Sequence, residues 1–146
     1  MKTWNDKLHC GKQPQTKRLE KDFAGMKAGS LMYISTPLEV DQYAKEIPYG
    51  LLVSPKVMRD DLAKRNGADH TCPVSTGIFL RIVSEAAFED YKEINCITEI
   101  TPFWRIVAPD SDMAKKLNCS PEFIITQRES EMQNKSLHPT AGNAPV

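Results

Sequence analysis

The sequence contains no long apolar run, no excess of one charge and no closely spaced pair of cysteines. Its 146 residues leave room for one domain with tails. No stretch approaches the roughly 18 apolar residues of a membrane span, and the first residues lack the apolar core of a signal peptide. Nineteen Lys and Arg balance nineteen Asp and Glu, which argues against a protein that coats nucleic acid through bulk positive charge. We therefore expect one cytoplasmic domain without a membrane segment.

The chain is also poor in the groups that metal and cofactor sites require. Its widely spaced cysteines and its three histidines are Cys10, Cys72, Cys96, Cys119, His9, His70 and His138. They form no four-ligand zinc pattern, and no Gly-rich phosphate loop occurs, so we predict neither a metal nor a cofactor. His70 lies near Cys72 where a loop enters a helix, and a positive helix end favours a reactive thiolate. An enzyme that uses Cys72 is therefore a minor alternative to a buried, inert thiol.

Positive charge is concentrated at the start of the chain. Residues 1–35 carry seven Lys and Arg against three Asp and Glu, and few large apolar residues precede Leu31. We interpret residues 1–30 as a basic, mobile arm and residues 31–134 as the folded domain. Residues 135–146 are small, polar and rich in helix breakers, which predicts a disordered tail.

Three Ser/Thr-Pro steps mark helix starts, because each places a capping hydroxyl before a proline in the first turn. They predict helices over about 36–46, 55–65 and 121–133. A fourth helix, over about 74–92, follows from apolar residues that recur every four positions from Val74 to Ala86. Short strands are expected at 31–34 and 51–53, and the β-branched and aromatic segment 97–107 predicts one or two more.

Two helices joined by a short connection and followed by a strand pair indicate an α+β, winged-helix-like domain. In this arrangement a helix-turn-helix is completed by a small β wing. We expect the early turns of its two helices to face DNA, with these candidate contacts: Ser54, Lys56, Ser75, Thr76 and Gly77.

Four segments then occur in a recognisable order: IPYG at 47–50, LA at 62–63, RIVSEA at 81–86 and PFWRIV at 102–107. Over about residues 38–133 the chain resembles the DNA-binding domain of alkylguanine-DNA alkyltransferases, the methylated-DNA–protein cysteine methyltransferases, and of the alkyltransferase-like proteins. That family reads roughly IPxG, LA, RAVGxA and PCHRV. The resemblance implies a winged helix that extrudes a base from double-stranded DNA into a pocket at the PCHR segment.

The resemblance assigns residues to this pocket one by one. Arg81 matches the arginine that fills the gap left by the extruded base, and Pro102 and Arg105 match the ends of PCHR. Phe103 stands in place of the methyl-accepting cysteine and Trp104 in place of its activating histidine. Because alkyl transfer needs a thiolate poised by a base, self-methylation is excluded at this position and no catalytic residue is expected.

The interpretation is therefore a non-catalytic DNA-binding protein that recognises alkylated or distorted bases without repairing them. Phe103 and Trp104 would form a pocket wall, although the core of a strand is the better interpretation for at least one of them, because neighbouring strand positions point to opposite faces. Arg81 would contact DNA, although Glu85 one turn later offers it an ion-pair partner. The alternative is a protein-interaction or regulatory module that kept the fold and lost DNA binding.

The stretch 136–146 is similar to peptides read from the recombination sites at the ends of integron gene cassettes. This resemblance implies a horizontally acquired bacterial protein and carries no information about chemistry.

Overall fold

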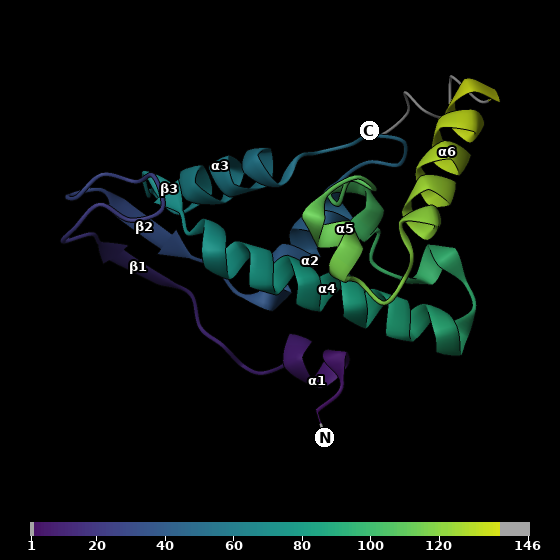
Figure 1. The fold of residues 1–146 in the computed structure, drawn as a ribbon, viewed down its shortest axis with the longest axis horizontal. Helices are drawn as coiled ribbons and strands as arrows, with labels where there is room; N and C mark the ends of the chain where they lie inside the picture. Colours follow the sequence, from purple (N-terminus) through teal and green to yellow (C-terminus); the bar gives the residue numbers. More distant parts are fainter. Residues whose placement is uncertain (1, 138–146) are drawn as a thin grey trace.

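Helix α4 (Pro73–Ile94) runs lengthwise through the molecule, from the sheet at one end to helix α6 (Pro121–Leu137) at the other (Figure 1). The structure is a computed structural model that describes residues 2–137. At 22 residues, α4 is about 33 Å long. Helices α1 (Trp4–Leu8) and α2 (Pro37–Glu46) pack directly against it. The described residues form an α+β domain of six α-helices and one three-stranded mixed sheet.

The sheet has the order β1 (Gln15–Arg18), β2 (Leu31–Ile34), β3 (His70–Thr71). Strands β1 and β2 are antiparallel, with Gln15 opposite Ile34, and β3 runs parallel to β2, with Thr71 opposite Tyr33. The strand expected at 31–34 is therefore confirmed, and it lies in the centre of the sheet rather than at its edge.

The Ser/Thr-Pro signals place three helices correctly. Helices α2, α3 (Pro55–Arg65) and α6 all begin at the predicted prolines. The Thr36 hydroxyl accepts the Glu39 N–H at 3.1 Å, and the Ser54 hydroxyl accepts the Val57 N–H at 3.1 Å. Helix α4 extends the prediction by one residue at its start and two at its end, and the residue that caps it, Asn95, has a φ of 54° in the left-handed region.

The N-terminal segment differs from the mobile arm that we expected. Helix α1 is capped by Thr3 and held on α4 by Glu89, which accepts the backbone N–H groups of Trp4 at 2.9 Å and Asn5 at 3.0 Å. Strand β1 then pairs with β2. In residues 2–30, a carboxylate and a strand partner thus add to the few apolar contacts, which come chiefly from Trp4, Leu8 and Met26.

Segment 97–107 forms two 3₁₀ turns in place of the predicted strands: η1 (Ile97–Glu99) and η2 (Phe103–Arg105). Its backbone bonds are mostly local, such as Ile106 N–H to the Phe103 carbonyl at 3.0 Å. Most of the β-branched and aromatic side chains of this segment are buried without forming a strand. Strand propensity largely reflects how well a side chain packs on a half-buried surface, so such residues can also occur in a buried turn. The strand expected at 51–53 is also absent; the Val53 N–H makes one bond to the Arg105 carbonyl at 2.8 Å. A short helix, α5 (Asp112–Lys116), follows a turn at residues 109–110.

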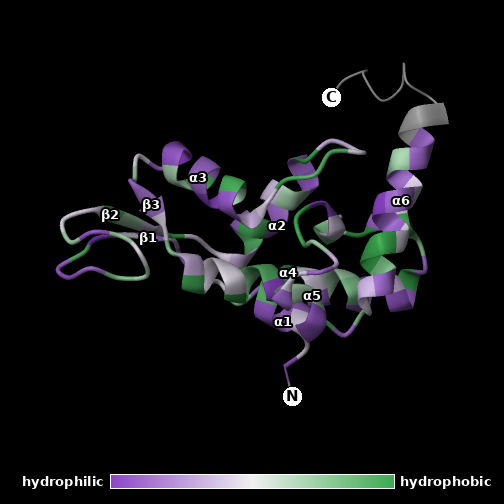
Figure 2. Cartoon of the chain, turned by 45° about the horizontal axis from the view of Figure 1, so that its top comes forward, coloured by the Kyte–Doolittle hydropathy of each residue, from purple (hydrophilic) through white to green (hydrophobic). Residues whose placement is uncertain are grey.

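The hydrophobic core lies where α2, α3, α4, η2 and the first turn of α6 meet. Val40, Met58, Leu62, Val83, Phe103 and Ile124 are fully buried there. Figure 2 shows hydrophobic residues gathered along the centre of the molecule, whereas the middle turns of α6 carry several hydrophilic residues. Within residues 2–137, no helix has the length and apolar character to cross a membrane.

Helix α6 continues through Leu137, three residues into the segment that we expected to be disordered. The rest of that predicted tail, residues 138–146, lies outside the described residues.

Substituting Glu89→Gln should loosen α1. Burial by itself raises the pKa of Glu89. The hydrogen bonds from the N–H groups of Trp4 and Asn5 together lower this pKa by more than burial raises it, so the pKa of Glu89 lies below its ordinary value. Its stabilising contribution is therefore present above the unfolded pKa and is lost as the pH falls through the lower, folded pKa. We expect a loss of about 1 kcal/mol at neutral pH, as for a lost helix cap, with faster hydrogen exchange in residues 4–8.

The matched control is Glu93→Gln, an exposed carboxylate on the same helix. Exchange measured by mass spectrometry should be unchanged in that variant. Equal protection of residues 4–8 in both variants would contradict the proposed role of Glu89.

Candidate functional site

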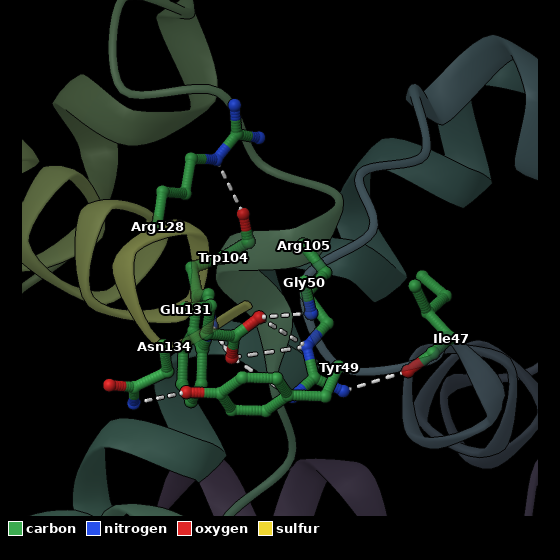
Figure 3. A network of polar contacts seen from close by, with 8 residues as sticks. All are labelled: Ile47, Tyr49, Gly50, Trp104, Arg105, Arg128, Glu131 and Asn134. Carbon is green, nitrogen blue, oxygen red and sulfur yellow. Dashed lines mark hydrogen bonds and ion pairs between the residues drawn. The ribbon is translucent and has the colours of Figure 1, made fainter. Parts of the chain in front are cut away.

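A buried carboxylate joins three separate segments at one end of the molecule (Figure 3). Glu131 of α6 accepts the Gly50 backbone N–H at 3.0 Å and Trp104 Nε1 at 2.8 Å. Arg105 donates to both carboxylate oxygens, from Nε at 3.0 and 3.2 Å and from Nη2 at 2.9 Å. Arg128, also on α6, donates from Nε to the Trp104 carbonyl at 2.6 Å. The loop after α2, turn η2 and helix α6 are thereby held in one arrangement.

The arginine of this network has little freedom of its own. Arg105 is 12% exposed and also donates from Nη1 to the Ile47 carbonyl at 2.7 Å. Its guanidinium lies 5.4 Å from the centre of the Tyr49 ring, and the Tyr49 hydroxyl accepts a hydrogen bond from Asn134 Nδ2 at 2.7 Å. A charged pair that is buried but fully hydrogen-bonded orients its neighbours strongly, because few other arrangements satisfy its polar atoms.

A cavity of about 580 Å³ opens beside this network. Its lining includes Lys45, Tyr49, Pro102, Trp104, Gln127 and Asn134. Two cations (Lys45 and Arg105) balance two carboxylates (Glu99 and Glu131) in the lining, and the ion pair between Arg105 and Glu131 is already satisfied. The cavity therefore offers aromatic surface, hydroxyl and amide groups to a polar, uncharged ligand rather than to an ion.

Three of the four residues that the resemblance assigns to a base pocket line this cavity: Pro102, Trp104 and Arg105. Phe103 does not. Its ring is fully buried and stacks on Phe123, with ring centres 6.0 Å apart and planes 5° from parallel. The expectation that Phe103 forms a pocket wall is therefore wrong, because the turn η2 directs it into the core.

The sequence reasoning missed the residue that organises the site. Glu131 lies on α6, where charged and polar residues surround it in the chain and nothing marks it as buried. Tyr49 belongs to the IPYG segment, and the sequence alone indicates no role for its side chain. A buried charge opposite an arginine 26 residues away leaves no local periodic signal that would reveal it.

Arg81 lies in a second cavity, of about 520 Å³, which shares no lining residue with the first. Its Nε is 3.6 Å from Glu85 Oε2, its Nη2 donates to the Lys116 carbonyl at 3.3 Å, and its guanidinium lies 5.3 Å from the Trp4 ring centre. The ion-pair partner foreseen for Arg81 is thus present. The side chain remains 39% exposed, although its Nε is buried and, among residues 2–137, has no hydrogen-bond partner.

The other predicted DNA contacts do not gather around Arg81. Ser54 caps α3, and Lys56 pairs with Asp60 at 3.0 Å. On α4, Ser75 is half-buried, and Thr76 is buried with its hydroxyl donating to the Cys72 carbonyl at 2.6 Å. Gly77 alone of this group lines the cavity of Arg81.

No cysteine lines either cavity. Cys72 and Cys119 are buried, and burial together with the nearby Glu85 carboxylate raises the pKa of the Cys119 thiol to about 11. His70 lies exposed on β3. Within residues 2–137, no group of three or more His, Cys, Asp or Glu side chains is placed to hold a metal ion.

Comparison of the chain with models of known families, with curated proteins and with solved structures finds no match.

Substituting Glu131→Gln should destabilise the whole domain. Arg105 would keep a buried charge without a counter-charge, and removing one partner of a buried pair costs about 3 kcal/mol. The free energy of unfolding, measured with urea at pH 7, should fall accordingly. Glu129→Gln, an exposed carboxylate on the same helix, should change it by less than about 0.5 kcal/mol. Equal midpoints for both variants would show that Glu131 does not organise the site.

Proposed function

We propose that the protein binds double-stranded DNA without chemical catalysis and accepts an extruded base, alkylated or distorted, in the cavity beside Trp104. The observation that carries the proposal is the cavity itself. It forms at the PFWR segment where the family resemblance expects a base pocket, and a network centred on Glu131 holds its aromatic and polar walls in place.

The chemistry of the cavity suits a nucleobase. A base is planar, uncharged and bordered by hydrogen-bonding groups, and enzymes that extrude bases read them by stacking and by contacts to the pairing edge. Tyr49 is 45% exposed and offers a ring face, while Gln127 and Asn134 bring amide groups. In this proposal Trp104 and Arg105 position the site rather than react, because their polar atoms are already bonded to Glu131.

Phosphate contacts fall to the basic hairpin formed by β1, β2 and their connection. Lys17, Lys21 and Lys27 are exposed there, and among residues 2–137 none of them forms an ion pair. This local basic surface would bind the backbone even though the whole chain is neutral. The winged-helix comparison belongs to this proposal: the hairpin takes the place of the wing, and α3 and α4 that of the two helices.

The absence of a thiol in the cavity lining supports recognition without repair. Phe103→Cys should therefore fail to accept a methyl group from O6-methylguanine in duplex DNA. The new thiol would lie in the core against Phe123, and Trp104 supplies no base to form a thiolate. Mass spectrometry of the protein after incubation with the methylated duplex measures the transfer. A mass gain of one methyl group at residue 103 would show that the cavity is misplaced.

Binding is tested by fluorescence anisotropy of a labelled duplex, with and without one methylated guanine, at two salt concentrations. We expect tighter binding to the methylated duplex. Tyr49→Ala should weaken that binding roughly tenfold, because base–aromatic stacking contributes about 1–3 kcal/mol. Leu52→Ala, which removes an equally exposed side chain from the same loop but outside the cavity, should not.

The hairpin is tested in the same assay. The double variant Lys17→Gln, Lys21→Gln should bind both duplexes more weakly and to the same extent. Its affinity should also depend less on salt, because each phosphate contact contributes roughly 0.9 to the slope of log affinity against log salt concentration. Equal affinity for both duplexes would leave a general DNA binder. No binding at low salt would overturn the proposal and favour the alternative, a module that binds a protein partner through exposed apolar residues such as Val74 and Ile78.

A further inference from the structure

The cavity that holds Arg81 lies between α1, α4 and α5 and plays no part in the proposed base site. Trp4 and Lys7 come from α1, Met113 and Lys116 from α5, and one face of α4 supplies the remaining residues. Its volume of about 520 Å³ falls in the range of small-molecule sites.

Gly77 opens this cavity. It lies inside α4, where glycine is the least favourable residue apart from proline, and it has ordinary helical backbone angles. A Cβ atom built at this position meets no other atom within 4 Å, so packing inside the protein does not require a glycine. The missing side chain leaves open space in the wall of the cavity.

The apolar part of the cavity is exposed although it belongs to the central helix. Val74 and Ile78, one turn apart on α4, are each 56% exposed. They continue inward to Ile82 and Met113, which are half-buried. Together with Gly77, these side chains form an apolar surface that only water covers in the isolated chain.

The polar part of the cavity is positive. Lys7, Arg81 and Lys116 line it, and no carboxylate does. Arg81 is paired with the buried Glu85, which lies 3.6 Å away and also accepts the Asn118 N–H. Lys7 lies 4.1 Å from the Trp4 ring centre, and among residues 2–137 neither Lys7 nor Lys116 forms an ion pair.

We propose that this cavity binds a small organic anion with an apolar body, such as an aryl or alkyl carboxylate, sulfonate or phosphate ester. The apolar body would cover Val74, Ile78 and the space left by Gly77, and the anionic group would lie between Lys7 and Lys116. Apolar surface and positive charge in the lining of one concave site match these two halves of such a molecule.

The probe is 8-anilinonaphthalene-1-sulfonate, titrated against the full chain at low salt while its fluorescence is measured. We expect one saturable site. Gly77→Leu fills the open space and should weaken binding at least tenfold while the melting temperature stays equal or rises. Glu93→Leu adds the same side chain at an exposed position of α4 outside the cavity, and it should bind like the unmodified protein.

The charge requirement is tested with two neighbouring lysines. Lys116→Gln should lower the affinity for the anionic probe about threefold to tenfold. The affinity for the uncharged analogue N-phenyl-1-naphthylamine should not change. Lys115→Gln, on the same helix but outside the lining, should change neither. Should Gly77→Leu unfold, Gly77→Ala and Lys116→Gln still test the site.

Three results would overturn the proposal. Undiminished binding to Gly77→Leu would place the probe elsewhere, and equal affinity for both probes would indicate apolar surface without anion selectivity. Displacement of the probe by unlabelled duplex DNA would assign these cations to phosphate groups of the DNA instead. Because the base site has a separate lining, loss of DNA recognition in Tyr49→Ala does not bear on this test.

Discussion

The arrangement of the C-terminal half depends on one desolvated carboxylate. A charged group that leaves water must be neutralised and hydrogen-bonded, and Glu131 meets this requirement with Arg105, the Trp104 indole and the Gly50 N–H. No single segment of the chain supplies these donors. The loop after α2, the turn η2 and helix α6 must therefore meet at one point, and the cavity beside Trp104 exists because they do.

Two more carboxylates, both on α4, likewise accept N–H groups from other segments of the chain. Glu89 accepts the first N–H groups of α1, and Glu85 accepts the Asn118 N–H that follows α5. Backbone N–H groups at helix ends and in loops need an acceptor once they are buried, and a carboxylate is the strongest one available. The central helix thus carries an apolar face toward the core and acidic anchors for segments with few apolar residues of their own. This explains how a highly charged N-terminal segment is held although it contributes few apolar side chains, chiefly Trp4, Leu8 and Met26, to the core.

Local signals predicted the four longer helices (α2, α3, α4 and α6) because the causes of these helices are local, whereas α1 and α5 were not predicted. A hydroxyl before a proline sets a helix start through contacts within four residues, as Thr36 and Ser54 show. The strands predicted for segment 97–107 were wrong because their signal was not local hydrogen bonding but side-chain burial. Its β-branched and aromatic residues are selected for burial, and Phe103 satisfies that requirement from a 3₁₀ turn as well as from a strand. The ordered contacts of the N-terminal segment could not be predicted from the sequence, because the bond from Trp4 to Glu89 spans 85 residues.

The sequence by itself determined the α+β class, the starts of the main helices and the position of Pro102, Trp104 and Arg105 in one segment. It also determined that Phe103 cannot act as a thiol nucleophile. Only the tertiary structure decided that Phe103 points into the core, that Trp104 and Arg105 face a cavity, and that Arg81 belongs to a different one. The physical reason is range: caps and apolar periodicity act within a few residues, whereas burial, charge compensation and cavities are properties of segments that meet only after folding.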